Sequence, residues 1–312
     1  MANASYDKSM LETTLERPGC LSAAELERAR ASIAANGMAV LRNFVAREVT
    51  AKMAATALTV CSKGYGVGLG VSMQPFIDPQ TAEFRHPYAC SKEAVEFATN
   101  ESFMTLLEDF LGPQPIIHNT VFQVTFPRDK QMLDYHVDCG SVKSLNPKKK
   151  FADFRLRTIL YLSDVESGGF SYILNSAKDA LQTYMPLPYA QLFPPEAVPA
   201  DPDRRIVVNH PAGTLIIFDT HGLHRPEIPR AQRIVLNTWF ARKDFSGNLP
   251  GTLFSLGLVP PDRRHRLHIF ENERGCNAEK YCEAEPQAES LLRRLLKAIR
   301  PPKASSNYAS YE

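Results

Sequence analysis

The sequence lacks most of the residues that would place it in a specialised class of protein. Its 312 residues include six cysteines, and none of these form a C-x-x-C pair. A disulfide framework is not expected in a chain of this size without a secretion signal. No apolar run approaches the roughly 18 residues of a membrane-spanning helix, and residues 1–16 contain no signal-peptide core. We therefore expect a cytoplasmic protein with reduced thiols.

Charge of either sign is not in excess. The chain has 36 basic and 34 acidic residues, so composition gives no reason to expect nucleic acid or a membrane surface as a partner. Hydrophobic residues make up 44% and charged residues 22%, which argues against a mainly disordered chain. The length suits one large domain or two small ones. We expect a small-molecule partner and a monomer or homodimer.

The N-terminal third is predicted to be mainly helical. Ser22 and Glu25 form a capping-box pattern that opens a helix ending near Asn36, and Gly37 stands where a C-terminal glycine cap belongs. The other elements predicted here are a strand at 38–45 and helices at 47–61 and 92–111.

After residue 114 the pattern changes to short runs rich in β-branched and aromatic residues, bounded by turn residues. Helices followed by many short strands favour a helix-flanked sandwich or barrel over alternating β/α units. Leucines at helical spacing predict a last helix within 286–300, and 301–312 is expected to be disordered. The predicted strands are 116–126, 155–162, 170–174, 205–209, 214–218 and 233–240.

Two loops are candidate covers for a pocket. Residues 64–70 carry glycine at every second position, which does not fit a dinucleotide-binding loop and predicts either a plain loop or a lid. Residues 143–150 contain four lysines, which predict either a solvated surface or an anion-binding rim.

His136 and Asp138 are the first candidate metal ligands. On a strand, side chains two residues apart point to the same face, so this imidazole and this carboxylate could meet at one point. A second histidine from another strand would complete the two-histidine, one-carboxylate set that leaves positions open on Fe(II). The pair alone is a weak signal, because its spacing arises readily by chance.

A second segment strengthens this hypothesis. A glycine-led apolar strand over 213–219 runs into a turn that contains His221 and His224, and Arg233 begins the next strand. The planar fork of arginine matches a carboxylate in a bidentate manner. Such a cation suits the far carboxylate of 2-oxoglutarate, whose 2-oxo acid end binds iron.

On these residues the sequence resembles the Fe(II)/2-oxoglutarate-dependent dioxygenase superfamily, and most closely its phytanoyl-CoA dioxygenase-like branch. The likeness extends from about Gly37 to Phe240, and Asn175 stands where a glycine is usual in the G-S-x-K-type turn of that branch. The segments that carry the likeness are 37–44, 106–112, 136–138, 161–165, 168–170, 175–178 and 218–224, with Arg233.

The resemblance implies a mainly β fold with flanking helices, whose core is a double-stranded β-helix, the cupin-like jelly roll. Two four-stranded sheets are expected, with the N-terminal helices packed on one of them. One domain would cover 1–300, with its core at about 114–242 and the N-terminal helices within 22–111.

The resemblance also implies a site. Fe(II) would bind His136, Asp138 and His224, with 2-oxoglutarate and O2 as cosubstrates and Arg233 on the distal carboxylate. The family's spacing from the strand end favours His224 over His221. Decarboxylation of 2-oxoglutarate would be coupled to hydroxylation, desaturation or cyclisation of a small molecule, in secondary or specialised metabolism.

Further contacts are expected around this site. The strand that precedes H-x-D lines the pocket in relatives, so Gln123 is a candidate contact for cosubstrate or substrate. Asn237 shares a strand face with Arg233 and is a candidate substrate contact. Trp239 and Tyr135 are further candidates for contact with substrate.

Two other interpretations are open to test. A redox-silent cupin-like metal protein (an isomerase, hydrolase or binding protein) could hold Zn or Mn with the same ligands. Arg233 counts against it, because such a site has no need of a 2-oxoglutarate-binding cation. A related halogenase is disfavoured, because a halide would have to replace the carboxylate ligand and Asp138 is present.

Overall fold

The computed structural model describes residues 6–62, 71–73, 81–131, 133–138, 155–177, 201–243, 253–270 and 276–277. The candidate lid at 64–70, the lysine-rich loop at 143–150, and the predicted helix and tail beyond 286 lie outside these residues. Within the described part of the chain, none of the helices is long and apolar enough to cross a bilayer.

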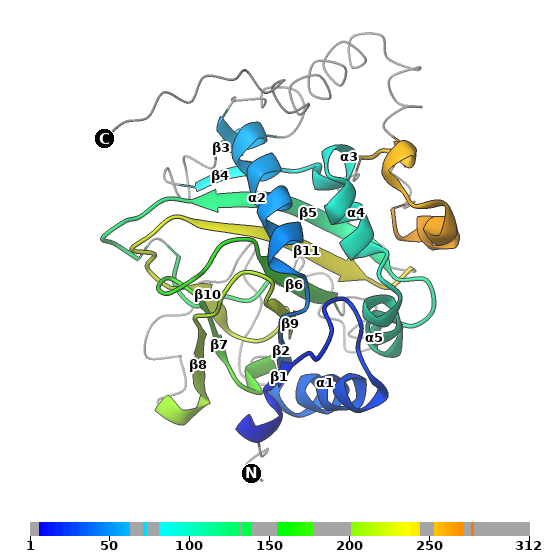
Figure 1. The fold of residues 1–312 in the computed structure, drawn as a ribbon. Helices are drawn as coiled ribbons and strands as arrows, with labels where there is room; N and C mark the ends of the chain where they lie inside the picture. Colours follow the sequence, from blue (N-terminus) through cyan, green and yellow to red (C-terminus); the bar gives the residue numbers. More distant parts are fainter. Residues whose placement is uncertain are drawn as a thin grey trace, which may run out of the picture.

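The larger sheet has eight strands in the order β1-β2-β9-β6-β11-β5-β4-β3 (Figure 1). Its four central strands are antiparallel neighbours, whereas β1 and β2 at one edge are parallel. The strands are β1 (Glu12–Thr14), β2 (Met38–Arg42), β9 (Leu215–Asp219), β6 (Arg155–Tyr161), β11 (Arg233–Ala241), β5 (Ile116–Thr125), β4 (Thr81–Phe84) and β3 (Val71–Met73).

The smaller sheet contains β10 (His224–Pro226), β7 (Phe170–Ile173) and β8 (Arg205–Val208), in that order. His136 extends it by an isolated antiparallel bridge to His224. From Ile116 onward the chain passes repeatedly between the two sheets: β5, β6, β9 and β11 enter the larger one, while the His136 segment, β7, β8 and β10 enter the smaller one. This topology is the double-stranded β-helix, and the predicted fold class is confirmed.

Two details of the predicted sheets are wrong. The segment carrying His136 and Asp138 is not a strand, because it makes only a single bridge: His136 and His224 exchange backbone hydrogen bonds of 3.0 Å. The larger sheet has eight strands rather than four, because β2 and β4 pair with the outer edges of β9 and β5 and continue from there. Covering those edges satisfies backbone groups that would otherwise be unpaired.

Helices cover the face of the larger sheet that is turned away from the smaller sheet (Figure 1). The capping box at Ser22 and Glu25 is confirmed, and Gly37 has a left-handed φ of 80° at the end of the first helix. The helices are α1 (Ala23–Asn36), α2 (Arg47–Ser62), α3 (Pro87–Cys90), α4 (Lys92–Ala98) and α5 (Glu101–Leu111). Short 3-10 helices occupy Lys8–Met10, Pro202–Arg204, Leu256–Leu258 and Pro261–Ile269, and the short strands β12 (Leu253–Phe254) and β13 (Cys276–Asn277) pair with each other.

The single helix predicted over 92–111 is in fact two helices, α4 and α5. Asn100 separates them, because its side-chain oxygen accepts a hydrogen bond from the backbone N–H of Phe103 at 3.0 Å. Asparagine is a favourable N-cap, so its side chain competes with continued helix at this position.

Strand alternation divides the interior into two cores. On β9, Leu215 and Ile217 belong to the core beneath the helices, whereas Ile216 and Phe218 belong to the core between the two sheets. The same alternation on β11 sends Val235 toward the smaller sheet. The second core is therefore where the sheets face each other.

Asn175 has a φ of 59°, which explains the departure noted in the sequence. This left-handed backbone conformation favours glycine, and asparagine is among the few other residues that tolerate it. The Asn175 N–H donates to the carbonyl of Asn36 at 2.7 Å and so ties the turn to the end of α1.

Candidate metal centre and cavity

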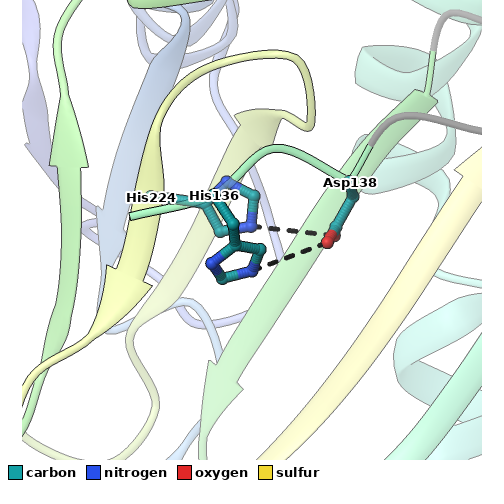
Figure 2. A group of neighbouring side chains, drawn as sticks. All are labelled: His136, Asp138 and His224. Atoms are coloured by element: carbon teal, nitrogen blue, oxygen red, sulfur yellow. Dashed lines mark ion pairs between the residues drawn. The ribbon is translucent and has the colours of Figure 1, made fainter. Parts of the chain in front are cut away.

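His136, Asp138 and His224 come together between the two sheets (Figure 2). One potential ligand atom from each side chain lies within 4.8 Å of the others. The bridge between His136 and His224 sets this geometry, because it places the two imidazole rings 4.3 Å apart between centroids. Asp138 is held beside them by its backbone N–H, which donates to the carbonyl of Thr220 at 2.9 Å.

Both histidines are held in one tautomer. His136 Nδ1 lies 3.0 Å from the carbonyl oxygen of Asp134, and His224 Nδ1 lies 2.8 Å from that of Gly222. A carbonyl oxygen only accepts, so each Nδ1 carries a proton, and the neutral form of each ring has its lone pair on Nε2. Both Nε2 atoms lie 3.7 Å from an oxygen of Asp138, and that of His224 is buried with no hydrogen-bond partner among the described residues.

The electrostatics of the cluster favour the protonation state that a metal requires. Burial, together with the charge of neighbouring His224, lowers the pKa of His136 to about 3. Burial alone would raise the pKa of Asp138, but the charges of Arg157 and His224 outweigh it and hold that pKa well below its usual range. A neutral His136 and an ionised Asp138 therefore coexist at neutral pH, as metal ligation demands.

Arg157 and Trp239 hold one oxygen of the candidate carboxylate ligand. Asp138 Oδ2 accepts a hydrogen bond from Trp239 Nε1 at 2.9 Å and another from Arg157 Nη1 at 3.0 Å. Arg157 and Trp239 face each other across β6 and β11, and the guanidinium lies 3.9 Å from the centre of the indole ring. Outer partners of this kind orient metal ligands.

Sequence reasoning missed Arg157. The available signal was a basic residue within an apolar strand, on the same face as Ile159 and Tyr161. That signal becomes informative only when the strand register shows that this face meets Asp138 and Trp239.

A cavity of about 90 Å³ adjoins the cluster. Arg233, Val235 and Asn237 line it in alternation along β11, as expected for residues on one strand face. Arg233 is only 6% exposed, and its guanidinium donates to the carbonyl of Gly168. The other lining residues are Gln123, Leu133, His136, Arg157, Ile159, Tyr161, Phe170, His224, Arg225 and Pro226.

Three other candidates lie elsewhere. His221 is not part of the cluster, because its ring and its backbone N–H both bond to Asp219 Oδ1 at 2.9 Å. Tyr135 does not line the cavity: its hydroxyl bonds to Ser171 at 2.7 Å, and Arg225 lies 4.4 Å over its ring. Trp239 contacts Asp138 rather than the cavity.

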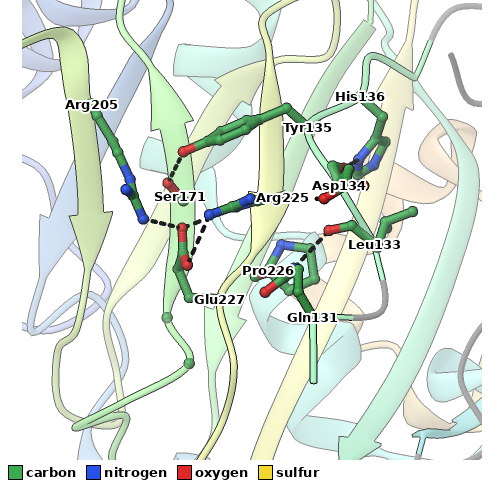
Figure 3. A network of polar contacts seen from close by, with 12 residues as sticks. Gln131, Leu133, Asp134, Tyr135, His136, Ser171, Arg205, Arg225, Pro226 and Glu227 are labelled. Carbon is green, nitrogen blue, oxygen red and sulfur yellow. Dashed lines mark hydrogen bonds and ion pairs between the residues drawn. The ribbon is translucent and has the colours of Figure 1, made fainter. Parts of the chain in front are cut away.

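A polar network braces the two histidine-bearing segments against each other (Figure 3). Gln131 Nε2 donates to the carbonyls of Leu133 and Pro226, at 2.6 and 2.7 Å, and so joins the His136 segment to β10. On the other side of β10, Glu227 pairs with Arg225 at 3.2 Å and with Arg205 at 2.8 Å. These contacts fix the backbone on which both ring orientations depend.

Comparison with known proteins gives a likeness of fold. No family model matches the chain, and no curated protein matches it. The epimerase SnoN in complex with Fe3+, alpha ketoglutarate and nogalamycin RO is similar, with a TM-score of 0.50 and 15% identity over 71% of this chain and 85% of that chain. A second structure of SnoN, described as a non-heme alpha ketoglutarate dependent epimerase from nogalamycin biosynthesis, has a TM-score of 0.47 and 15% identity over 71% and 82% of the two chains. At this identity the first of these establishes a shared architecture, and the chain is a double-stranded β-helix protein with a three-residue candidate metal centre at its cavity.

Proposed function

We propose that this protein is an Fe(II)- and 2-oxoglutarate-dependent oxygenase of the phytanoyl-CoA dioxygenase-like branch, acting on a small molecule of specialised metabolism. One observation carries the proposal: His136, Asp138 and His224 converge at the same cavity that the buried guanidinium of Arg233 lines. The solved structure with the similar fold, SnoN, is described as holding iron and alpha ketoglutarate, which supports the proposal.

The donor set fits Fe(II). Two imidazole nitrogens and one carboxylate are the ligand types of non-haem iron sites that keep positions open for other ligands. The lone pairs of both Nε2 atoms are directed by the Nδ1 hydrogen bonds, and the buried His224 Nε2 has no competing hydrogen bond in the described structure. Three protein ligands would leave further positions of the metal open for a chelating cosubstrate.

The remaining residues have distinct tasks in this proposal. Bound iron and 2-oxoglutarate would supply the activation of O2 for oxidation of a C–H bond. Arg233 binds the distal carboxylate of 2-oxoglutarate through its planar fork of donors. Arg157 and Trp239 both donate to Asp138 Oδ2 and would so orient the carboxylate that binds the metal. The apolar walls formed by Ile159, Phe170 and Val235 limit water at the reacting centre.

We include three reaction outcomes in the proposal. Hydroxylation, desaturation and cyclisation all begin with removal of a hydrogen atom from substrate. SnoN is described as an epimerase. Epimerisation would in addition need a hydrogen donor on the opposite face and a reductant, so it is not part of this proposal.

The proposal is tested by adding Fe(II) and 2-oxoglutarate without oxygen and then measuring succinate release in air with pools of small molecules. A weak visible charge-transfer band should form in the anaerobic complex, and succinate release should rise with the correct pool. Iron binding without any binding of 2-oxoglutarate would contradict the proposal and favour the redox-silent metal protein.

Arg233→Leu sharpens this test. Removing the charged partner of a buried carboxylate costs about 3 kcal/mol, so 2-oxoglutarate binding should weaken by roughly a hundredfold while iron affinity is kept. Arg230→Leu is the matched control, because Arg230 is exposed and does not line the cavity. Calorimetric titration of both variants measures the two affinities. If the control loses 2-oxoglutarate binding and Arg233→Leu keeps it, the assignment of Arg233 is wrong.

A further inference from the structure

A buried carboxylate fixes the orientation of the first amide in a polar chain beside the cavity. Glu83 on β4 is 7% exposed and lies opposite Gln123 in the pairing of β4 with β5. Gln123 Nε2 donates to Glu83 Oε1 at 2.8 Å. The accepting oxygen of this carboxylate requires a donor, so the nitrogen end of the amide faces Glu83. The oxygen end of Gln123 therefore faces away from Glu83.

The orientation of the Gln123 amide in turn fixes that of a second amide, Asn237. Gln123 Oε1 accepts a hydrogen bond from Asn237 Nδ2 at 3.2 Å. One N–H of the Asn237 amide is thereby engaged, and its Oδ1 is the acceptor that remains. Asn237 lines the cavity and is 1% exposed, and its Oδ1 is buried with no hydrogen-bond partner among the described residues. A buried acceptor without a donor is costly, so this atom has a reason to be matched by a ligand.

We propose that Glu83, Gln123 and Asn237 form a polar relay that offers a hydrogen-bond acceptor at the cavity wall and selects a substrate with a hydroxyl or amine donor. The inference rests on the proposed function in taking the occupant of this cavity to be the substrate. The relay assigns the Asn237 oxygen to the substrate rather than to the cosubstrate, because the carboxylates and the keto group of 2-oxoglutarate only accept hydrogen bonds. Gln123, whose two amide ends are both engaged, acts on the substrate through Asn237.

The position of Asn237 suits this task. It lies on β11 between Arg233 and Trp239, on the same strand face as both. Arg233 would hold the distal carboxylate of the cosubstrate, and Trp239 holds the candidate metal ligand Asp138. A donor on the substrate that reaches Asn237 would place the neighbouring carbon atoms between these two points.

Matched fragments test the relay in the metal-free protein, without 2-oxoglutarate. Cyclohexanol and cyclohexylamine carry a donor, whereas methoxycyclohexane presents only an acceptor. Ligand-observed NMR titration of the full chain should give the two donors at least about tenfold tighter binding than the ether, because the ether leaves the Asn237 acceptor unpaired. This measurement needs no turnover, so the relay and the oxygenase reaction can fail separately.

Two variants keep the test sharp. Asn237→Leu removes the acceptor at similar volume and should abolish the preference for donors. Glu83→Gln lets the first amide accept or donate, so the chain can reverse and the preference should shrink to about twofold or less. The thermal midpoint of each variant reports whether it still folds.

Equal binding of cyclohexanol and its methyl ether by the wild type would overturn the relay, as would the absence of binding by both donors. A preference that survives in Asn237→Leu, or one that is unchanged in Glu83→Gln, would overturn it too.

Discussion

The two faces of the larger sheet are built from the same strands but have different chemistry. The face beneath the helices is apolar: Leu156 and Leu160 on β6 lie beside Leu236 and Phe240 on β11, all fully buried. The opposite face of these two strands carries Arg157, Tyr161, Arg233 and Asn237 between apolar residues. Neighbouring residues on a strand point to opposite sides, so alternation places the apolar side chains beneath the helices and the polar ones at the cavity.

The cavity face of the larger sheet carries the energetic cost of burying polar side chains. On the cavity face, Tyr161, Asn237 and Arg233 are buried nearly as deeply as the leucines behind them, and the Arg157 side chain is 14% exposed. Burial of polar groups without hydrogen bonds is unfavourable. The structure offsets the cost with specific partners, such as Asp138 for Arg157 and the carbonyl of Val208 for the Tyr161 hydroxyl at 2.7 Å. Changes on the helix face should therefore affect stability, and changes on the cavity face should affect ligand binding.

The largest expected effect concerns the cavity side. His224→Ala should weaken Fe(II) binding by more than a factor of about 100, because it removes a ligand rather than one of the outer partners, whose loss costs about 10- to 100-fold. His221→Ala is the matched control, three residues earlier and bonded to Asp219 instead. Metal titration by calorimetry compares them. A larger loss in the His221 variant would reverse the choice between the two histidines.

On the helix face, Phe240→Ala should lower the free energy of unfolding by about 3–5 kcal/mol, because it opens a cavity in a packed core. Phe240 is fully buried, and its ring centre lies 5.4 Å from that of Phe103 on α5. Denaturant unfolding measures the loss. The folded fraction should still bind one Fe(II) per chain, and loss of metal binding at full folding would show that the two faces are not separate.

A titrating group on the helix side should make stability fall in acid. Burial, with a smaller contribution from the charge of Arg85, lowers the pKa of His86 to about 4. Between pH 6.5 and 4 the unfolded chain binds a proton that the folded chain does not, so the free energy of unfolding falls as pH falls, by roughly 3 kcal/mol. The contribution is complete above pH 6.5.

His86→Phe should reduce this loss when both proteins are unfolded in urea at pH 7 and pH 4.5. His136 contributes to the acid loss in both proteins, so the difference between them isolates His86. Identical losses would show that His86 is not responsible.

The smallest expected effect concerns the hydrogen bond that Trp239 donates to the candidate metal ligand Asp138. Trp239→Phe keeps the aromatic ring but removes the hydrogen bond to Asp138 Oδ2, and should weaken metal binding by about tenfold. Stability should change little. Unchanged metal affinity would mean that Arg157 alone is enough to orient the carboxylate.

Local signals in the sequence were sufficient for much of the fold. The capping box at Ser22, the glycine at Gly37 and the longer apolar strands depend on neighbouring residues, and these predictions were right. The short strands β1, β3, β4 and β10 were not predicted, because three or four residues carry too little pattern and are stabilised by pairing with distant strands.

The candidate site also contains residues that local sequence predicts and residues that it does not. His136, Asp138, His224 and Arg233 could be chosen from short motifs, and the structure brings them to one cavity. Arg157 and Glu83 could not, because their relevance depends on which residue faces them across the sheet. Arg157 lies opposite Trp239, and Glu83 lies opposite Gln123, at sequence separations that no local pattern reports.

The most direct test of the metal centre uses Trp239, the one tryptophan in the chain, whose indole nitrogen lies 2.9 Å from Asp138 Oδ2. Anaerobic titration with Fe(II) should quench its fluorescence and saturate at one metal per chain, and Asp138→Ala should abolish the quenching at the same metal concentrations. Absence of quenching in the wild type, or equal quenching in the Asp138 variant, would contradict the assignment of His136, Asp138 and His224 as an iron site.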